Sequence, residues 1–379
     1  MNSDRRERPG PRVTVIGAGP LGSSLAFRLA RSGARVTVVE RDRPGCSPES
    51  ETFAWVNAFS KSPRSFHDLH VEALRALERL NSEVGGGWLH VGGSLHWGDG
   101  ATGNEFEAFE TAVETMRAWG ARIVEPSLGE LARIEPDLDP ESLGGRRPVH
   151  IPRGAHVFAR QMAGAVLRAG VRDHGVRYRR ATADGVETAG GRVTGVRLSG
   201  GDVVEADVVM VAAGAASAAL TASAGAELRT VSRQPGAFLV TAPSAAELRT
   251  VVMAPRVSMR SDGGGRVMIG SSALSHLRGD QVGPDLVAET LDAARAHVPA
   301  LRGVGVEAIR GGVRTVPEDG RPIVGPDPAV AGLYHVATHN AVTLGPVLAE
   351  MVADDLRGLP VAALEPYRPR RFTAPPRDT

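Results

Sequence analysis

The stretch Val13-Thr14-Val15-Ile16-Gly17-Ala18-Gly19-Pro20-Leu21-Gly22 decides the fold of this chain of 379 residues. An apolar run leads into a glycine-rich turn, and the apolar periodicity from about Leu21 to Arg31 predicts a helix that stops at Gly33. A second apolar run, residues 36–39, ends at Glu40. This order predicts a strand, a turn, a helix and a second parallel strand, because continuous Val and Ile runs are typical of strands covered on both faces.

In this context the turn predicts a dinucleotide site that contains Gly17, Gly19, Pro20, Leu21 and Gly22. Glycine permits the tight turn, lets the backbone approach a pyrophosphate and lets helix and strand pack closely, while the helix N-terminus faces the phosphates. Glu40 is placed to accept hydrogen bonds from the adenosine ribose, and its charge excludes the 2′-phosphate of NADP. We expect the next residue, Arg41, beside the cofactor as well. The turn alone leaves NAD and FAD open.

Composition and charge exclude several classes of function. Lys+Arg 44 and Asp+Glu 43 leave a formal charge of +1, so no overall field attracts nucleic acid or an anionic membrane. The length predicts two domains, and the hydrophobic fraction of 42% is that of a globular chain. The single cysteine, Cys46, excludes an internal disulfide and a cysteine zinc cage, and we expect no metal. Lys61 is the only lysine.

The first ten residues lack the apolar segment of a signal peptide, and no apolar run of membrane-spanning length follows. We therefore expect a cytoplasmic protein without a membrane span. The sequence leaves the oligomeric state open.

Later segments are expected to complete the parallel sheet and to form a second one. The stretches Val203 to Ala213 and Leu333 to Ala337 are candidate strands of the parallel core, and a long helix near 343–357 should carry Pro346 in its first turn. Residues 257–269 predict a β-hairpin across Asp262-Gly263-Gly264-Gly265.

We therefore predict an α/β fold (α+β overall), in which a Rossmann-like cofactor domain with a parallel sheet carries an inserted, mostly antiparallel β-sheet substrate domain. The predicted cofactor domain comprises 11–75, 150–225 and 305–370, the substrate domain 76–149 and 226–304, and flexible tails 1–10 and 371–379.

Over nearly its whole length the sequence resembles the FAD-dependent family of D-amino-acid oxidases, glycine oxidases and sarcosine oxidases. Besides the glycine turn, the resemblance rests on four blocks in family order: Ser50 to Asn57, Val211 to Ser217, Gly312 to Gly325 and His335 to Pro346. It implies FAD as the cofactor. The block from Gly312 has no cysteine, which in the sarcosine oxidases attaches the flavin, so the resemblance implies noncovalent FAD.

The resemblance also implies the remaining cofactor-binding residues. They lie in the loop after the second strand, at the end of the strand after Gly175, at a small-residue turn, in the block from 312 and at the start of the last helix. The corresponding residues here are Thr52, Phe53, Ala54, Trp55, Asn57, Ala183, Ala212, Ala213, Gly214, Gly312, Arg314, His339, Asn340, Val342 and Thr343. The last helix would direct its N-terminal N–H groups toward flavin N1 and the C2 carbonyl, where negative charge develops on reduction.

Arg314, His339 and Asn340 are the predicted catalytic residues. Arg314 matches the family arginine that pairs with the substrate carboxylate, since a guanidinium is a planar, two-pronged donor. His339 and Asn340 are expected beside the flavin or the substrate. The expected reaction is hydride transfer to flavin N5 from the carbon that bears a neutral amine, which gives an imine and requires no protein base.

Several alternatives stay open. The electron acceptor is oxygen, which gives peroxide, or a quinone or carrier protein, because Met268 stands where some relatives have a lysine thought to help oxygen react. An NAD-dependent dehydrogenase, a flavin hydroxylase and a flavin-binding protein without turnover are the rival functions. The substrate is a small amine or a D-, L- or N-alkyl amino acid, in a catabolic or a biosynthetic role. Two interpretations of His96 and Trp97 also stay open: they face the substrate, or they belong to a half-buried strand without a role in the site.

Overall fold

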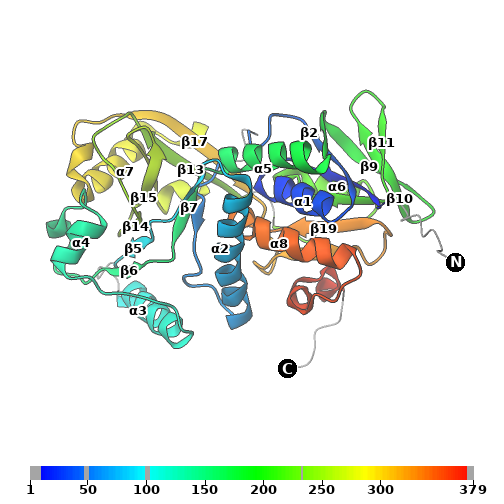
Figure 1. Cartoon of the computed structure of the whole chain (residues 1–379). Helices are drawn as coiled ribbons and strands as arrows, with labels where there is room; N and C mark the ends of the chain where they lie inside the picture. Colours follow the sequence, from blue (N-terminus) through cyan, green and yellow to red (C-terminus); the bar gives the residue numbers. More distant parts are fainter. Residues whose placement is uncertain (1–9, 47–50, 99–102, 232–233, 374–379) are drawn as a thin grey trace.

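The computed structural model describes residues 10–46, 51–98, 103–231 and 234–373, with two parts side by side (Figure 1). The first part contains a six-stranded sheet in the order β18-β19-β12-β1-β2-β8. Its strands are β1 (Arg12–Ile16), β2 (Arg35–Glu40), β8 (Arg177–Arg180), β12 (Val208–Val211), β18 (Ile323–Pro326) and β19 (Leu333–Ala337). All neighbours are parallel except β18 and β19. The predicted parallel core is thereby confirmed.

Helices cover one face of this sheet and a small sheet covers the other. On the first face, α1 (Pro20–Arg31) packs against α5 (Ala159–His174) and α8 (Ala341–Leu356), and α8 packs against α2 (Arg64–Val84). On the second face lies the antiparallel sheet of β9 (Ala183–Ala189), β10 (Arg192–Leu198) and β11 (Val203–Glu205), followed by α6 (Ser217–Ala222). Both faces are therefore apolar, as the continuous Val and Ile runs predict.

Two details of the predicted core are wrong. Within Val203 to Ala213 only β12 joins the parallel sheet, because Asp207 interrupts the run and accepts a 2.8 Å hydrogen bond from the backbone N–H of Arg12. The preceding residues form β11 in the antiparallel sheet instead. The last helix begins at Ala341, so Pro346 is its sixth residue and lies in the second turn, where its missing N–H leaves one helical hydrogen bond unmade.

The second part contains a seven-stranded sheet in the order β17-β13-β16-β15-β14-β5-β6. Its strands are β5 (Ser94–His96), β6 (Val149–Ile151), β13 (Gln234–Thr241), β14 (Val251–Met253), β15 (Ser258–Gly263), β16 (Arg266–Gly270) and β17 (Val306–Arg314). Only β5 and β14 pair in parallel. The predicted hairpin is the β15–β16 pair, and the mostly antiparallel character of the sheet is confirmed.

The remaining elements complete the second part and join it to the first. The helices α3 (Gly103–Ala118), α4 (Leu128–Ile134) and α7 (Pro284–His297) lie around the seven-stranded sheet (Figure 1). A fourth sheet, antiparallel and three-stranded, consists of β3 (Trp55–Val56), β7 (Ala155–Val157) and β4 (Leu89–His90). The short helices are η1 (Pro140–Leu143), η2 (Gly214–Ala216), η3 (Ala273–His276), η4 (Gly279–Gln281), η5 (Pro299–Leu301), η6 (Ala362–Tyr367) and η7 (Pro369–Phe372).

The domain division stays a prediction. Its border between residues 75 and 76 falls within α2. The predicted C-terminal tail begins inside η7, where Arg371 pairs with Asp319 at 2.8 Å, and most of both predicted tails lies outside the described residues.

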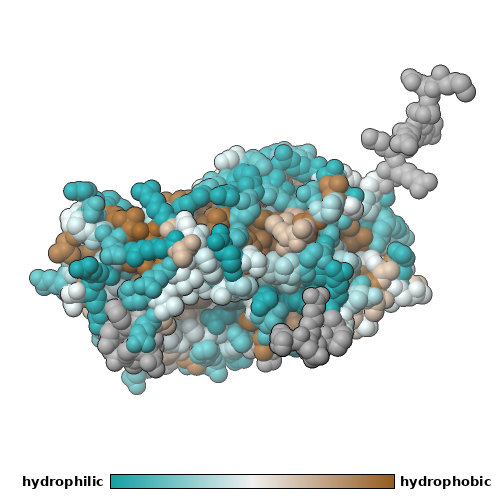
Figure 2. All heavy atoms as spheres, turned by 90° about the horizontal axis from the view of Figure 1, so that it is seen from below, coloured by the Kyte–Doolittle hydropathy of each residue, from teal (hydrophilic) through white to brown (hydrophobic). Residues whose placement is uncertain are grey.

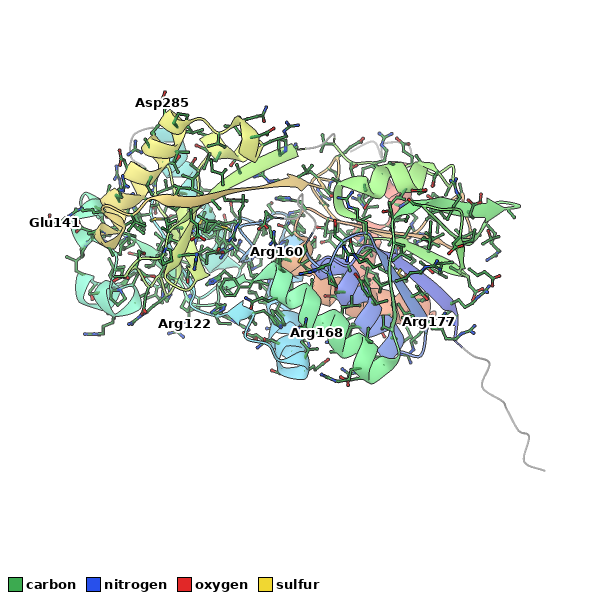
Figure 3. All side chains as sticks on the ribbon, turned by 90° about the horizontal axis from the view of Figure 1, so that it is seen from above. Arg122, Glu141, Arg160, Arg168, Arg177 and Asp285 are labelled. Carbon is green, nitrogen blue, oxygen red and sulfur yellow. The ribbon has the colours of Figure 1, made fainter. Side chains whose placement is uncertain are left out.

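The visible surface is mainly polar. Figure 2 shows one face on which hydrophilic residues predominate and apolar residues form separate groups. Figure 3 shows Glu141 and Asp285 at the outer edge of the second part, and Arg168 and Arg177 on the first. Among the helices of the described residues, none combines the length and the apolar character that crossing a membrane requires.

Candidate functional site

The turn between β1 and α1 needs glycine at both ends. Gly17 has φ +104°, and a Cβ added to it would lie 2.5 Å from the carbonyl oxygen of Ala212. A Cβ on Gly22 would overlap the carbonyl oxygen of Gly17. Gly19 differs, because nothing lies within 4 Å of the position that its Cβ would take. The turn is therefore closely packed at Gly17 and Gly22 and has open space beside Gly19.

The first turn of α1 adjoins this open space. Gly19 is the N-cap, Pro20 opens the helix, and neither a side-chain cap nor an acidic residue is present in this first turn. The N–H groups at the start of the helix thus have no side-chain partner there, and the helix dipole adds partial positive charge. This geometry fits a phosphate group.

Glu40 is fixed at the end of β2. Its two carboxylate oxygens accept hydrogen bonds from the backbone N–H groups of Ala18, at 2.8 Å, and Asp42, at 2.9 Å. Each oxygen can accept a further bond, so Glu40 is able to accept hydrogen bonds from ribose hydroxyls. Arg41 follows with its side chain half exposed and its Nε 3.2 Å from Asp42. The turn, α1 and Glu40 together fit a dinucleotide whose ribose lacks a 2′-phosphate.

Small residues at the end of β12 lie directly beneath the turn. The Ala212 N–H donates to the carbonyl of Ile16 at 2.9 Å, and Ala213 leads to Gly214, which has φ +57°. Ala183 lies elsewhere than predicted: it is the first residue of β9 and pairs with Leu198, instead of ending the strand after Gly175. That strand, β8, already ends at Arg180, before the chain turns.

The loop after β2 is held by local hydrogen bonds. Thr52 Oγ1 accepts from the N–H of Ala54, which has φ +51°, and the buried Asn57 accepts from the N–H of Phe59 at 3.0 Å. Phe53 stacks on Phe238 of β13 with ring centroids 5.9 Å apart. This loop thus touches the seven-stranded sheet. Of the predicted block, Ser50 lies outside the described residues.

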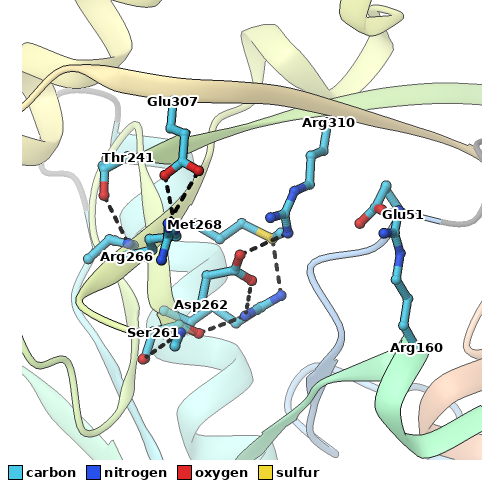
Figure 4. A network of polar contacts seen from close by, with 12 residues as sticks. Glu51, Arg160, Thr241, Ser261, Asp262, Arg266, Met268, Glu307 and Arg310 are labelled. Carbon is cyan, nitrogen blue, oxygen red and sulfur yellow. Dashed lines mark hydrogen bonds and ion pairs between the residues drawn. The ribbon is translucent and has the colours of Figure 1, made fainter. Parts of the chain in front are cut away.

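A buried guanidinium fixes that contact. Arg260 of β15 donates from Nε to the carbonyl of Phe53 at 2.6 Å and from Nη1 to Asp262 at 3.1 Å. Asp262 also pairs with Arg310 of β17 at 2.8 Å, and Figure 4 shows these two side chains facing each other beneath β17. Burial lowers the pKa of Arg260 to about 10, and the charge of Asp262 opposes this effect. Met268 Sδ lies 3.1 Å from Nη2 of Arg260.

Replacing Arg260 by methionine is expected to destabilise the fold by about 3 kcal/mol, because the buried Asp262 then keeps Arg310 as its cation but loses Arg260, and the carbonyl of Phe53 loses its donor. The matched control on the same hairpin is Arg266→Met, which removes an exposed pair with Glu307 and should cost less than about 1 kcal/mol. Urea unfolding of both variants measures the two free energies. Equal losses would contradict a structural role of Arg260.

Arg314 ends β17 as a half-buried cation. Its Nη1 donates to the carbonyl oxygens of Ser275, at 2.7 Å, and Pro235, at 3.4 Å. A Cβ on Gly236, which pairs in register with the predicted site residue Gly312, would lie 2.5 Å from Nη2, so glycine makes room for the guanidinium. Burial lowers the pKa of Arg314. No carboxylate of the described residues forms an ion pair with it, and this arrangement suits an anionic ligand.

His339 and Asn340 lie immediately before α8. Burial, together with the positive charges of Arg314 and Lys61, lowers the pKa of His339 to about 4. The imidazole is therefore neutral at pH 7. Asn340 is the N-cap of α8, and its side chain makes no capping bond. The first turn of the helix contains no acidic residue, so its N–H groups suit a developing negative charge.

The structure brings several predicted residues together. Arg314 and His339 share one electrostatic cluster, and α8, which opens with Val342 and Thr343, packs on α1, since a Cβ on Gly345 would lie 3.3 Å from Cα of Leu21. The structure does not join Ala183 or Asn57 to the Arg314 cluster.

The sequence left open whether His96 and Trp97 face the substrate. In the structure the two side chains have different surroundings. The ring of His96 lies 5.2 Å from Trp55 and 4.8 Å from Phe59, and burial lowers the pKa of His96 to about 3. Trp55 Nε1 is buried without a hydrogen-bond partner in the described chain. Trp97 packs in the core of the second part, 5.3 Å from His297.

Two basic residues at the site were missed: Arg260, and Lys61, whose charge reaches His339. Only the rarity of lysine in this chain could have drawn attention to Lys61. In the parts of the chain that the structure describes, no group of three or more His, Cys, Asp or Glu residues could hold a metal ion.

Comparisons with known proteins identify the family and the fold of the chain. The family model of the FAD dependent oxidoreductases, DAO, matches residues 12–355. The glycine oxidase of Pseudomonas aeruginosa is 29% identical over 377 residues, which cover 94% of this chain and 98% of that protein. The structure is similar to that of iminodiacetate oxidase from Chelativorans sp. BNC1, with 25% identity, a TM-score of 0.78 and coverage of 94% and 99%. Glycine oxidase from Geobacillus kaustophilus shares the fold, with 24% identity, a TM-score of 0.81 and coverage of 94% and 98%.

Proposed function

Because the chain belongs to the family of FAD-dependent oxidoreductases, we propose that it oxidises the C–N bond of a small amino acid or N-substituted amino acid. The observation that carries this proposal is Arg314, a half-buried guanidinium that no carboxylate of the described residues neutralises. A buried charge without a counterion is costly in the free protein, and a substrate carboxylate would supply the counterion.

The bound FAD would accept a hydride from the carbon next to the substrate nitrogen. The open turn above Gly19 and the carboxylate of Glu40 would hold its pyrophosphate and ribose. Arg314 would fix the carboxylate and thereby orient the α-carbon. The first turn of α8, after Asn340, would offer N–H groups where negative charge develops.

The names of the relatives support the proposed substrate class. A glycine oxidase and an iminodiacetate oxidase are among the proteins that the chain resembles over nearly its full length. Glycine and iminodiacetate share a carboxylate one carbon from the nitrogen. We propose such a compound as substrate and oxygen as the first candidate acceptor, with a quinone or carrier protein as the alternative. The division into a cofactor domain and a substrate domain belongs to the same proposal.

The test is to mix the purified yellow protein with a panel of substrates under anaerobic conditions. Glycine, N-methylglycine, iminodiacetate and D- and L-amino acids form the panel, and amines of the same skeleton without the carboxylate are the controls. At least one carboxylate compound should bleach the flavin absorbance much faster than its amine control. Admitting air then tests the acceptor, because oxygen would restore the colour and give peroxide. A flavin that none of the compounds bleaches would contradict the proposal.

A further inference from the structure

The seven-stranded sheet of the second part has two different faces. Ala237 and Leu239 of β13 and Met259 of β15 point into the hydrophobic core of that part. Because side chains alternate along a strand, Phe238 points the opposite way, and its ring stacks on Phe53 of the loop after β2 with centroids 5.9 Å apart. The face that carries Phe238, the inner face, is therefore turned toward the first part.

Two arginines of β17, Arg310 and Arg314, lie on this inner face. Arg310 pairs in register with Phe238. The next pair on the same face is Gly312 with Gly236, and neither of them has a side chain. The guanidinium of Arg314 fills part of this space, because a Cβ on Gly236 would lie 2.5 Å from its Nη2. Since Gly236 and Arg310 are diagonal neighbours, whose backbones lie about 7–8 Å apart in antiparallel strands, the charge of Arg314 comes close to the position of Arg310.

Three arginines share one acid in this part of the inner face. The register of β13, β16 and β15 places Arg260 on the same face as Arg310 and Arg314. Asp262 pairs with Arg310 at 2.8 Å (Figure 4) and with Arg260 at 3.1 Å. Arg314 forms no ion pair with a carboxylate of the described residues. One aspartate charge does not balance three guanidinium charges, so this region attracts an anion.

Arg310 has hydrogen-bond donors left for such an anion. In the described chain its Nη1 donates to Asp262, whereas a guanidinium carries five N–H groups in all. The side chain of Arg310 is 34% exposed, compared with 3% for Arg260, so a dissolved compound can reach it. Glu51, which Figure 4 draws in the same view, is already paired with Arg160. A carboxylate from outside the chain therefore matches the remaining donors of Arg310.

We propose that Arg310 makes the enzyme selective for amino acids that carry a second carboxylate. This inference rests on the proposed function, in which Arg314 holds the carboxylate next to the reacting C–N bond. The second carboxylate would accept two hydrogen bonds from the remaining N–H groups of Arg310, in the planar arrangement that guanidinium and carboxylate favour. Asp262 does not cancel this attraction, since Arg260 also offsets its charge. Glutamate and iminodiacetate are suitable probes, because each carries two carboxylates on a short flexible chain.

The kinetic test compares each acid with the amide of its second carboxylate, which has nearly the same size but no charge. The pairs are glutamate with glutamine, in D and L form, and iminodiacetate with its monoamide. In the unchanged protein kcat/KM should be about 10- to 100-fold higher for the acid, as expected for hydrogen bonds to a charged group. In Arg310→Met this ratio should fall to about one. Equal use of acid and amide by the unchanged protein would overturn the proposal, and so would a preference for glycine over both acids.

Charge reversal separates selectivity from a structural role. Arg310→Glu should invert the preference, so that ornithine, which ends in an ammonium group, is used better than glutamate. A variant that slows all compounds alike and keeps the preference for the acid would show that Arg310 only supports the fold, and the proposal would be wrong. Arg266→Met is the matched control, because it removes an arginine that pairs with Glu307 of β17 at 2.7 Å, and it should keep the full preference. Bound flavin absorbance and the unfolding temperature show whether each variant is intact.

A binding measurement tests the same contact without turnover. Glutarate and its monoamide, glutaramate, have no amine to oxidise, so titration calorimetry of the holoenzyme gives their dissociation constants. Glutarate should bind about 10- to 100-fold more tightly, and Arg310→Met should abolish this difference; equal affinities in the unchanged protein would contradict the proposal. The two levels fail separately. If no compound of the panel bleaches the flavin, the proposed function fails and takes this inference with it. If compounds bleach it but acids and amides react equally well, only the inference fails.

Discussion

Replacing Gly19 by valine is expected to give a folded protein that binds FAD much more weakly. The position has an ordinary backbone conformation, since Gly19 has φ −70°, and nothing lies within 4 Å of the place of its Cβ. A valine side chain therefore fits the polypeptide but occupies the space that the pyrophosphate needs. Loss of two hydrogen bonds to a charged phosphate costs about 3 kcal/mol, which raises the dissociation constant of FAD at least about 100-fold.

Two further glycine variants make this expectation specific. Gly129→Val, in α4, also has open space around its Cβ and should bind FAD as the unchanged protein does. Gly22→Val should destabilise the fold itself, because its Cβ would overlap the carbonyl oxygen of Gly17. Flavin fluorescence titration gives the affinity and circular dichroism the fold. A yellow Gly19→Val protein with unchanged affinity would contradict the placement of the cofactor at this turn.

The glycine turn could be predicted from the sequence because everything it requires is local. The order of strand, turn, helix and strand lies within 29 residues, and Gly17 and Gly22 meet their constraints from Ala212, next to β12, and from Gly17 itself. The hairpin of β15 and β16 is local in the same way, and its Asp262-Gly263-Gly264-Gly265 turn marks it. Features of this kind can be predicted because a short stretch of sequence contains all the residues that form them.

Contacts between distant segments escaped prediction. The hydrogen bond from Arg260 to the carbonyl of Phe53 joins residues 207 positions apart, and no periodicity or motif marks either partner. The end of the strand after Gly175 was predicted wrongly for another reason: the four side chains of β8, Arg-Tyr-Arg-Arg, are all exposed and lack the apolar pattern of a core strand, so nothing in them marks where the strand stops. In both cases the structure depends on a distant partner, Phe53 for Arg260 and β2 for β8, and not on the local sequence alone.

The candidate active site lies between these extremes. The family resemblance predicted Arg314, His339 and Asn340 as catalytic residues but not their surroundings. The structure adds the carbonyls of Ser275 and Pro235, which accept hydrogen bonds from the guanidinium. In it, the positive charge of Lys61 also acts on the pKa of His339. The sequence pattern identifies Arg314 as a charged residue of the site. That no carboxylate of the described residues pairs with it is visible only in the folded structure.

Replacing Arg314 by leucine is therefore expected to weaken the use of carboxylate substrates while the flavin stays bound. A hydrogen bond to a charged group contributes about 1.5–3 kcal/mol, so kcat/KM for an amino acid should fall about 10- to 150-fold. The same change should leave an amine without a carboxylate nearly unaffected, because that compound never used the guanidinium. Steady-state kinetics with both compounds, under conditions in which FAD saturates the protein, measures the two ratios.

The comparison of the two substrates separates a carboxylate-binding role from a structural one. Arg314 also donates to the carbonyl of Ser275, so its loss could shift η3, and such a shift would slow both compounds alike. The exposed Arg302 offers the control variant Arg302→Leu, which should change neither rate. A selective loss for the amino acid requires that its carboxylate meets the charge of Arg314 in the transition state. Equal rates of Arg314→Leu and the unchanged protein with the amino acid would contradict that contact, and the counterion for Arg314 would have to come from elsewhere.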